Sequence, residues 1–441
     1  MKGSYILVHS FVCNGDYFVF DSESGALLEI DEKAYKFLGG ETEGIAADEL
    51  KEIGEEIEEL KKQGVLYARS NPDNRLVKSK EIKSVCLHIS HDCNLRCRYC
   101  FAGEGAYHGE RQVMSAETGR KAIDFLIEHS GKRHNLELDF FGGEPLMNYE
   151  VLREVVSYGK EKAKEAGKEF KFTVTTNGVL FDEEKRKYLN EEMDNVVMSL
   201  DGRKEVNDKA RPTVNGKGSY DVIIDNYREF RKIRGDKSYF IRGTFTKDNL
   251  DFAEDVIAMS EMGFDQVSIE PVVLPEEHPM AISDKDLPVI FEQYEKLAKE
   301  YVERRKNDDT WFSFFHFNVN LEDGPCFRKR ITGCGAGSEY IAVAPNGDIY
   351  PCHQFVGEKG FLLGNVYTGI TREDIRDKIA SSTVFTKAKC ADCWAKYLCS
   401  GGCNANAIHY SKDINVPYEG ACEMMKKRLE CAMYVNAKEK I

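Results

Sequence analysis

Between residues 83 and 305 the sequence alternates between short apolar runs and longer amphipathic runs, and this alternation restricts the fold more than any other feature. The apolar runs are rich in Val, Ile, Phe and Tyr and have the length of strands, while helical periodicity fills the intervals. Six β–α units predict an α/β fold with a parallel sheet and right-handed crossovers, either doubly wound or a partial barrel. The predicted strands are 84–90, 136–142, 170–176, 195–200, 239–245 and 266–271.

Unusual polar motifs directly follow the first four predicted strands. The motif "DCNLRCRYC" follows the first strand, "GGEP" the second, "TNG" the third and "DG" the fourth. The carboxyl ends of parallel strands meet at one edge, which carries the active site in a barrel. We therefore expect a partial (β/α)6 barrel whose active site is built from these motifs.

The regions on either side of the alternating segment have other patterns. Residues 1–67 predict strands at 5–11, 16–20 and 26–30, helices at 31–40 and 47–64, and a last short strand at 65–67. Strands followed by helices suggest a winged helix-turn-helix-like domain, and the polar stretch 68–82 suggests a linker. Residues 306–441 contain nine of the fourteen cysteines and a hairpin signal at Asn346-Gly347.

Composition excludes several classes of protein. The formal net charge is −14 and the predicted helix at 47–64 is acidic, so we expect no nucleic-acid partner. No run of eighteen apolar residues predicts a membrane span, and the first residues lack the pattern of a signal peptide. We therefore expect a cytoplasmic protein, in which clustered cysteines bind metal or react rather than form disulfides.

Three cysteines, Cys93, Cys97 and Cys100, stand in the loop after the first predicted strand with the spacing C-x3-C-x2-C. A zinc site usually takes four ligands in paired knuckles, and no fourth ligand is well spaced here. A catalytic thiol needs one activated cysteine rather than three. A four-iron cluster held by three thiolates accounts for the number and leaves one iron open to a cofactor or substrate.

The triplet, with Tyr99 before its last cysteine, resembles the cluster motif of the radical S-adenosylmethionine (SAM) enzymes, and companion motifs follow in the family's order. The resemblance implies a catalytic [4Fe–4S] cluster on Cys93, Cys97 and Cys100 that binds SAM. It also implies SAM contacts from Tyr99, Gly142, Gly143, Glu144, Thr175, Asn177, Ser199, Arg211 and Glu270. Taken singly, most of these would be ordinary turn or surface residues, and Glu270 could instead pair with a basic neighbour.

The C-terminal cysteines form a second pattern, C-x2-C-x5-C-x3-C at 390–403 with further cysteines on either side. A zinc ribbon would need two C-x2-C pairs, and the sequence offers one. The pattern resembles the seven-cysteine SPASM extension, which implies two auxiliary [4Fe–4S] clusters, and so three clusters in all. One would bind Cys334, Cys352 and Cys403, and the other Cys390, Cys393, Cys399 and Cys422. The first is one ligand short, and either Cys326 or a substrate thiol would complete it; Cys431 is expected to be a buried thiol.

A recognition domain (1–67), linker (68–82), radical SAM core (83–305) and SPASM domain (306–441), in this order, resemble the maturases of "six cysteines in forty-five residues" peptides. The resemblance implies a cysteine-rich precursor peptide whose leader binds the N-terminal domain, and a low-potential electron donor such as ferredoxin or flavodoxin. The implied reaction joins a cysteine sulfur to a carbon of an acceptor residue, threonine by preference. The alternatives are an anaerobic sulfatase maturase, which normally lacks the recognition domain, and a non-catalytic iron–sulfur electron carrier, which would not need the GGE motif or Arg211.

Overall fold

The computed structural model describes residues 7–69, 79–107, 109–321 and 327–439. The chain forms two compact units, each assembled from separate stretches of sequence. We name them the barrel unit, which consists of residues 78–283 and 334–381, and the terminal unit, which consists of residues 1–77, 284–333 and 382–441.

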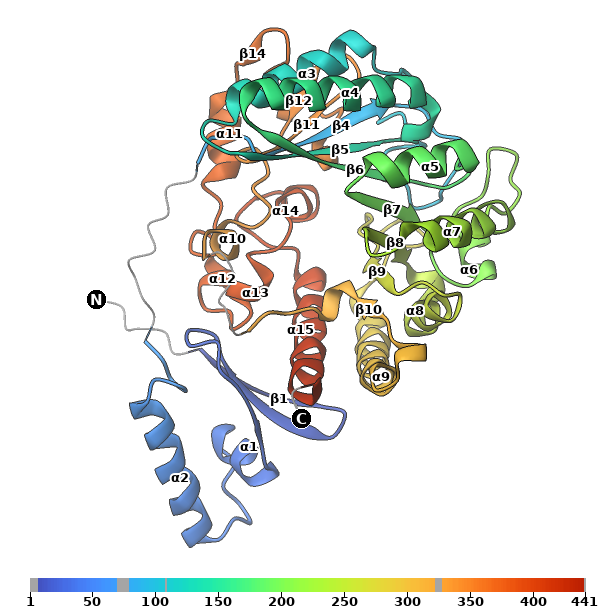
Figure 1. Ribbon diagram of the computed structural model, residues 1–441. Helices are drawn as coiled ribbons and strands as arrows, with labels where there is room; N and C mark the ends of the chain where they lie inside the picture. Colours follow the sequence, from blue (N-terminus) through green and yellow to red (C-terminus); the bar gives the residue numbers. More distant parts are fainter. Residues whose placement is uncertain (1–6, 70–78, 108, 322–326, 440–441) are drawn as a thin grey trace. The chain divides into compact units, whose positions relative to one another are not determined.

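Six parallel strands form the main sheet of the barrel unit (Figure 1), and each pairs with the next in chain order. This arrangement confirms the predicted partial barrel, and every strand lies within one residue of its predicted range. The strands are β4 (Ser84–Ser90), β5 (Asn135–Gly142), β6 (Glu169–Thr176), β7 (Asn195–Ser199), β8 (Ser238–Phe245) and β9 (Gln266–Pro271).

Helices follow the strands and cover the outer face of the sheet (Figure 1). Alternate residues such as Leu138, Phe140 and Phe172 are fully buried, whereas Asp139 and Thr173, on the other side of the sheet, are only half-buried. Each such apolar side chain stabilises the fold by roughly 1.5–3 kcal/mol, and polar groups are left for the inner face. The helices are α3 (Ala116–His129), α4 (Tyr149–Ala166), α5 (Glu183–Glu192), α6 (Lys204–Ala210), α7 (Tyr220–Arg234) and α8 (Phe252–Glu261).

Local chemistry sets the ends of these helices. The Ser115 side chain caps α3 by accepting a hydrogen bond from the N–H of Thr118. The Asp182 side chain caps α5 in the same way, from the N–H of Lys185. Helix α4 ends at Gly167, whose φ of 65° is a left-handed conformation that favours glycine.

A second group of strands extends the barrel sheet beyond β4. Strand β11 pairs in parallel with β4, and β12 returns antiparallel to β11, which confirms the predicted hairpin at Asn346-Gly347. No pattern in the sequence predicted that this hairpin would add to the first barrel strand. The elements of this part are β11 (Tyr340–Val343), β12 (Asp348–Tyr350), β13 (Gly364–Asn365), β14 (Gly369–Ile370) and α11 (Glu373–Ala380).

In the terminal unit, an antiparallel sheet of order β1-β2-β3 precedes two helices, as predicted. The predicted strand at 65–67 is wrong. The N–H groups of Val65 and Leu66 both donate to the Leu60 carbonyl at the end of the preceding helix, and Tyr67 has a φ of 55°, outside the β region. The elements are β1 (Val8–Cys13), β2 (Asp16–Asp21), β3 (Leu27–Ile30), α1 (Glu32–Leu38) and α2 (Ala47–Lys62).

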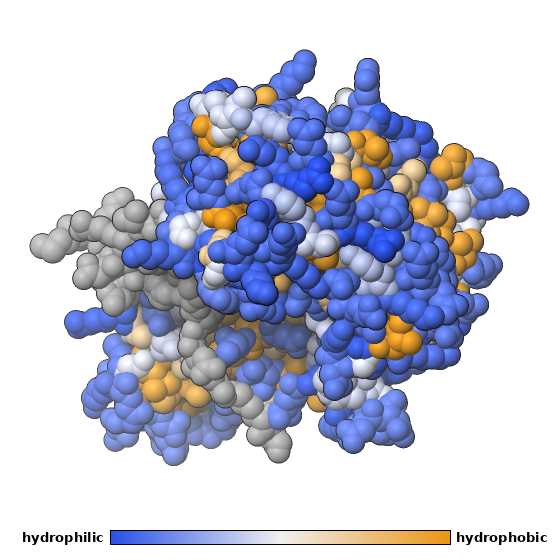
Figure 2. All heavy atoms as spheres, turned by 45° about the horizontal axis from the view of Figure 1, so that its top comes forward, coloured by the Kyte–Doolittle hydropathy of each residue, from blue (hydrophilic) through white to orange (hydrophobic). Residues whose placement is uncertain are grey.

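The rest of the terminal unit is mainly helical, and its two longest helices, α9 and α15, lie side by side (Figure 1). Its elements are α9 (Leu287–Arg305), β10 (Ser313–Phe314), α10 (Phe327–Thr332), α12 (Ala388–Ala391), α13 (Lys396–Cys399), α14 (Asn404–Ser411) and α15 (Glu419–Glu439). Among the described residues, none of the helices has both the length and the apolar character to cross a membrane. The face shown in Figure 2 is mostly hydrophilic, with small separate apolar patches.

Candidate functional site

The loop 93–100, which follows β4 and carries the first three cysteines, is held by backbone hydrogen bonds to the end of α6 and the residues directly after it. The N–H groups of Arg96 and Arg98 donate to the carbonyls of Pro212 and Ala210 at 2.7 and 2.9 Å. Because four backbone groups fix the middle of the loop, its cysteines stay together at the carboxyl edge of the sheet.

Two glycines at the end of β5 bring this strand against the cysteine loop. The N–H of Gly143 donates to the Ser90 carbonyl at 2.8 Å. A Cβ atom at Gly142 would lie 2.2 Å from the Ser90 oxygen, and one at Gly143 would lie 2.2 Å from the Asp92 oxygen. No side chain fits at either position, so the GG pair of the motif sets the position of the loop.

Glu144 ties the ends of β5 and β6 together. Its carboxylate accepts hydrogen bonds from the N–H groups of Leu146 and Asn177 (3.0 and 2.7 Å) and from the Thr176 hydroxyl (2.8 Å). The side chain is fully buried, and burial raises its pKa while these hydrogen bonds oppose the rise. Removing the carboxylate would leave buried donors unpaired, at roughly 1–3 kcal/mol for each.

Asn177 links β6 to the cysteine loop. Its side-chain amide donates to Asn94 at 2.8 Å and to the Cys93 sulfur at 3.6 Å. The neighbouring Thr176 points to Glu144, whereas Thr175 lies half-buried at the end of the strand. Of the "TTNG" residues, the amide of Asn177 therefore stands nearest to the predicted cluster.

Tyr99, Arg211 and Asp201 form a buried chain of hydrogen bonds at the same edge. Arg211 donates from Nη1 to the Tyr99 hydroxyl at 2.9 Å, and this hydroxyl donates to the Asp201 carboxylate at 2.9 and 2.8 Å. The sequence predicted Tyr99 and Arg211 but missed Asp201, although it belongs to the quoted motif "DG" at the end of the fourth strand. These hydrogen bonds fix the orientation of the Arg211 guanidinium.

Two other predicted SAM contacts lie further along the same edge. The Ser199 carbonyl accepts a hydrogen bond from the Tyr227 hydroxyl at 3.1 Å. Glu270 pairs with Arg242 on the neighbouring strand at 2.5 Å. Of the two alternatives for Glu270, the structure therefore shows the ion pair.

The donor set at this edge fits SAM on a four-iron cluster. Burial, and to a lesser degree the Glu144 carboxylate and the other two thiols, raises the pKa of Cys93 to about 12, so a bound cation would favour the thiolate here. Among the described residues, Nε of Arg211 and Nδ2 of Asn94 are buried with no hydrogen-bond partner for that atom. A free planar guanidinium edge suits a carboxylate such as that of SAM. No three His, Cys, Asp or Glu side chains in the described ranges converge on a single metal ion.

A cluster of buried polar side chains that the sequence analysis missed lies inside the barrel unit. His88 contacts His91 at 3.2 Å, and the Tyr340 hydroxyl contacts Nδ1 of His353 at 2.8 Å. Burial lowers the pKa of His353 to about 4, and burial, then His91 and His353, lowers that of His88. These imidazoles are therefore neutral near neutral pH. The alternation of Cys86 and His88 with apolar residues in "SVCLHIS" was the available signal.

Four of the C-terminal cysteines gather in the terminal unit: Cys390, Cys393, Cys399 and Cys422. Burial raises the pKa of Cys390 to about 11 and of Cys422 to about 12, and neighbouring thiols of the group add to both shifts. This is the set that the sequence predicted for the second auxiliary cluster. The buried Lys387 braces the same loops by donating to the Gly401 carbonyl and to Asn404 at 2.7 and 2.8 Å.

The remaining predicted ligands are divided between the units. Cys334, exposed, and Cys352, buried, belong to the barrel unit, and Cys403, exposed, belongs to the terminal unit. Cys326 lies outside the described residues. The expectation for Cys431 is confirmed: it is a buried free thiol, and its sulfur is 3.9 Å from that of Cys13.

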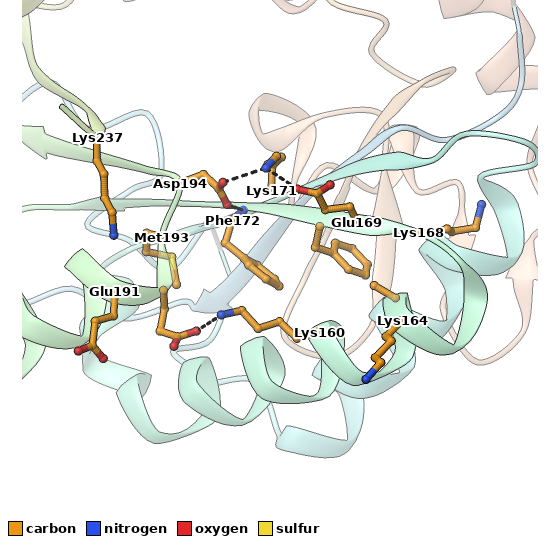
Figure 3. A pocket seen from close by; sticks show the side chains of 13 residues that line it. Lys160, Lys164, Lys168, Glu169, Lys171, Phe172, Glu191, Met193, Asp194 and Lys237 are labelled. Carbon is orange, nitrogen blue, oxygen red and sulfur yellow. Dashed lines mark hydrogen bonds and ion pairs between the residues drawn. The ribbon is translucent and has the colours of Figure 1, made fainter.

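A pocket of about 550 Å³ lies elsewhere, at the amino ends of β6 and β7 (Figure 3). Its charged side chains mostly pair with each other: Lys171 with Glu169 and Asp194, and Lys160 with Glu192. Since the predicted active-site motifs stand at the opposite edge of the sheet, this pocket takes no part in the site.

In a comparison with known proteins, two family models match the parts of the chain that carry the two groups of cysteines. Residues 87–259 match the family model of the radical SAM superfamily, and residues 334–394 match that of the SPASM iron–sulfur cluster-binding domain. The chain is 25% identical to the radical SAM cyclopropyl synthase TigE of Paramaledivibacter caminithermalis, over 92% of this chain and 90% of TigE. It is 24% identical to a cysteine-type anaerobic sulfatase-maturating enzyme of Clostridium novyi, over 74% of this chain and 89% of the enzyme.

Among solved structures, SuiB of Streptococcus suis bound to its precursor peptide SuiA shares the fold. The TM-score is 0.55 at 18% identity, and the match covers 94% of this chain and 98% of SuiB.

Proposed function

Because this chain joins a radical SAM domain to a SPASM iron–sulfur cluster-binding domain, we propose that it is a peptide maturase that forms thioether bonds in a cysteine-rich precursor peptide. One observation favours a peptide as the substrate. A sheet with an edge strand, β3, stands in the same compact unit as the gathered cysteines 390, 393, 399 and 422. An edge strand can bind an extended leader peptide by adding it to the sheet.

In this proposal the barrel edge binds SAM. Cys93, Cys97 and Cys100 would ligate a [4Fe–4S] cluster, and Arg211 would bind the SAM carboxylate through its free Nε edge. Bound there, SAM would supply the radical chemistry that removes a hydrogen atom from the substrate. The chain's own residues fix the geometry: Gly143 and Glu144 hold the cysteine loop, and Tyr99 and Asp201 orient the guanidinium.

The C-terminal cysteines would hold two auxiliary clusters. Cys390, Cys393, Cys399 and Cys422 would ligate one completely, whereas Cys334, Cys352 and Cys403 would leave the other one ligand short. A substrate cysteine at that open position would be bound as its thiolate, ready to attack an acceptor carbon, threonine by preference. In the balanced reaction the peptide loses a carbon-bound hydrogen and a thiol proton, and SAM gives methionine and 5′-deoxyadenosine. The electron that enters from a ferredoxin- or flavodoxin-like donor would be released again when the thioether forms, and an auxiliary cluster would accept it, so that SAM is the net oxidant.

The leader peptide would lie between β3 and α2. Helix α2 carries seven acidic residues, among them Asp48, Glu49 and Glu52. It carries only three lysines, Lys51, Lys61 and Lys62. We therefore expect a leader with basic residues beside an extended apolar stretch.

The test is anaerobic co-expression with the cysteine-rich peptide encoded nearest to this gene, followed by mass spectrometry. Each thioether removes the mass of two hydrogens and makes one cysteine resistant to alkylation. An unchanged peptide would contradict the proposal.

The second candidate is an anaerobic sulfatase maturase, which the similarity to the Clostridium novyi enzyme favours. Its product, formylglycine, reacts with hydrazides, and a thioether does not. A reduced protein that fails to cleave SAM would instead favour the electron carrier.

A further inference from the structure

The terminal unit contains a buried ion pair between the turn that follows β2 and the first residue of α13, which are far apart in sequence. Nζ of Lys396 lies 2.7 Å from Oε1 of Glu23, and only 3% and 5% of these side chains are exposed. The Tyr397 hydroxyl also donates to both carboxylate oxygens of Glu23, at 3.5 and 3.4 Å. Removing one partner from such a pair leaves an uncompensated buried charge, so each residue depends on the other for its position.

A second contact joins the same two regions. The Trp394 ring stacks on His9 of β1, with ring centroids 4.1 Å apart and planes 5° apart. Phe20 of β2 meets the same indole edge-on at 6.3 Å. The N-terminal sheet therefore packs on the segment 394–397 at two separate points.

This segment lies between two proposed cluster ligands and sets their backbone. The N–H of Lys396 donates to the Cys393 carbonyl at 3.1 Å, and the N–H of Cys399 donates to the Ala395 carbonyl at 2.8 Å. Tyr397 packs against Cys390 in a small buried cluster. Lys396 and Tyr397, which both contact Glu23, are thus bonded or packed to two of the four gathered cysteines, Cys393 and Cys390, and the neighbouring Ala395 is bonded to a third, Cys399.

On the other side of the ion pair, Glu23 belongs to a tight turn that leads into β3. The Asp21 carboxylate accepts from the N–H groups of Glu23 and Ser24, both at 2.9 Å, and Gly25 has a φ of 78°. Pairing of β2 with β3 begins at Phe20 and Leu27, directly after the turn. Movement of Glu23 would therefore be passed to the edge strand.

We propose that the Glu23–Lys396 pair couples iron occupancy of the loop 390–399 to the order of the turn 21–26 and of β3. Both are positioning residues. With iron bound, the cysteines fix Lys396 opposite Glu23; without iron, the loop relaxes, Glu23 loses its partner and the turn opens. Such linkage is reciprocal, so a peptide on β3 favours the iron-loaded loop. The inference rests on the proposed ligation of iron by Cys390, Cys393 and Cys399.

The test is hydrogen–deuterium exchange, read by mass spectrometry, on the full chain under anaerobic conditions, reconstituted with iron and sulfide or stripped by a chelator. In the wild type, amides of residues 22–30 exchange about fivefold or more faster after iron removal. In Lys396→Met they exchange fast in both states, and Lys396→Arg restores part of the response. Lys389→Met is the matched control, because Lys389 forms an exposed ion pair with Glu419 beside Cys390, and it behaves as the wild type.

Equal exchange of residues 22–30 in the loaded and stripped wild type would overturn the coupling. Glu23→Gln, nearly isosteric, gives the same comparison if Lys396→Met folds poorly. Iron content distinguishes a failure of the ligand assignment from a failure of the coupling. If Cys399→Ala keeps all its iron, the ligand assignment and the coupling both fail; if it loses iron and residues 22–30 do not respond, the coupling alone fails.

Discussion

The two cysteine loops of this chain are braced in different ways. Loop 93–100 is held by groups that follow other strands of the same sheet, such as Gly143, Asn177 and the segment 210–212. Loop 390–399 is held by His9 and Glu23, which lie more than three hundred residues earlier in the chain.

This difference shows what each loop can respond to. The supports of the first loop belong to a buried parallel sheet, which gives them a fixed position. The supports of the second belong to a small antiparallel sheet with an edge strand, whose order can change when a peptide adds to it. The barrel loop is therefore suited to constant chemistry and the terminal loop to communication with the substrate.

The largest effect is expected from Cys97→Ala. Loss of one of three ligands should remove about four irons per chain and reduce SAM cleavage to background, because the cluster has no spare thiolate. Iron analysis and chromatography of 5′-deoxyadenosine measure both. Cys86→Ala, which removes a buried thiol of β4 outside the loop, should keep the iron. Normal SAM cleavage by Cys97→Ala would refute the role of the loop.

Cys399→Ala tests whether the two cysteine loops function independently. It should also lose about four irons but keep reductive cleavage of SAM, because the barrel loop is supported independently. Peptide modification should be lost. If SAM cleavage falls together with the iron, the two loops do not act separately and the comparison fails.

Gly143→Ala tests the bracing of the barrel loop. The new methyl group would lie 2.2 Å from the Asp92 carbonyl oxygen, so the loop must move. We expect SAM cleavage to drop by roughly a hundredfold, the usual result of a displacement of about 1 Å in an active site. Gly360→Ala, where nothing lies within 4 Å of the new Cβ, is the control. Equal rates for both variants would show that the loop does not depend on this glycine.

A smaller effect is expected from Arg211→Lys, which keeps the charge and removes the planar fork. SAM should bind about tenfold more weakly, as measured by equilibrium dialysis of the reconstituted protein. The exposed Arg228→Lys should bind SAM normally. Unchanged affinity in Arg211→Lys would remove this residue from the SAM site.

The smallest effect is expected from Cys326→Ala. If a substrate thiol completes the first auxiliary cluster, this variant keeps its full iron content without substrate. Loss of about four irons per chain would show that Cys326 is itself the missing ligand.

The sequence predicted most of the barrel because local signals and the global fold agree there. Val, Ile and Phe at every second position predicted the strands, and Ser115 and Gly167 marked the ends of helices. It failed at 65–67, where a β-type composition was overridden by the capping of α2 by Val65 and Leu66. It also missed His88 and Asp201, because a polar residue that alternates with apolar ones on a strand is normally read as facing water, and an Asp-Gly pair is an ordinary turn signal.

The sequence by itself determined the cysteine spacings, the order of the parts and the motifs at the strand ends, because each depends on residues close together in the chain. Only the tertiary structure decided that β11 adds to β4, that Glu270 pairs with Arg242, and that Glu23 meets Lys396. These are pairings over long separations. They are chosen by packing and, for Glu23 and Lys396, by the need to pair buried charges, and no local pattern records them.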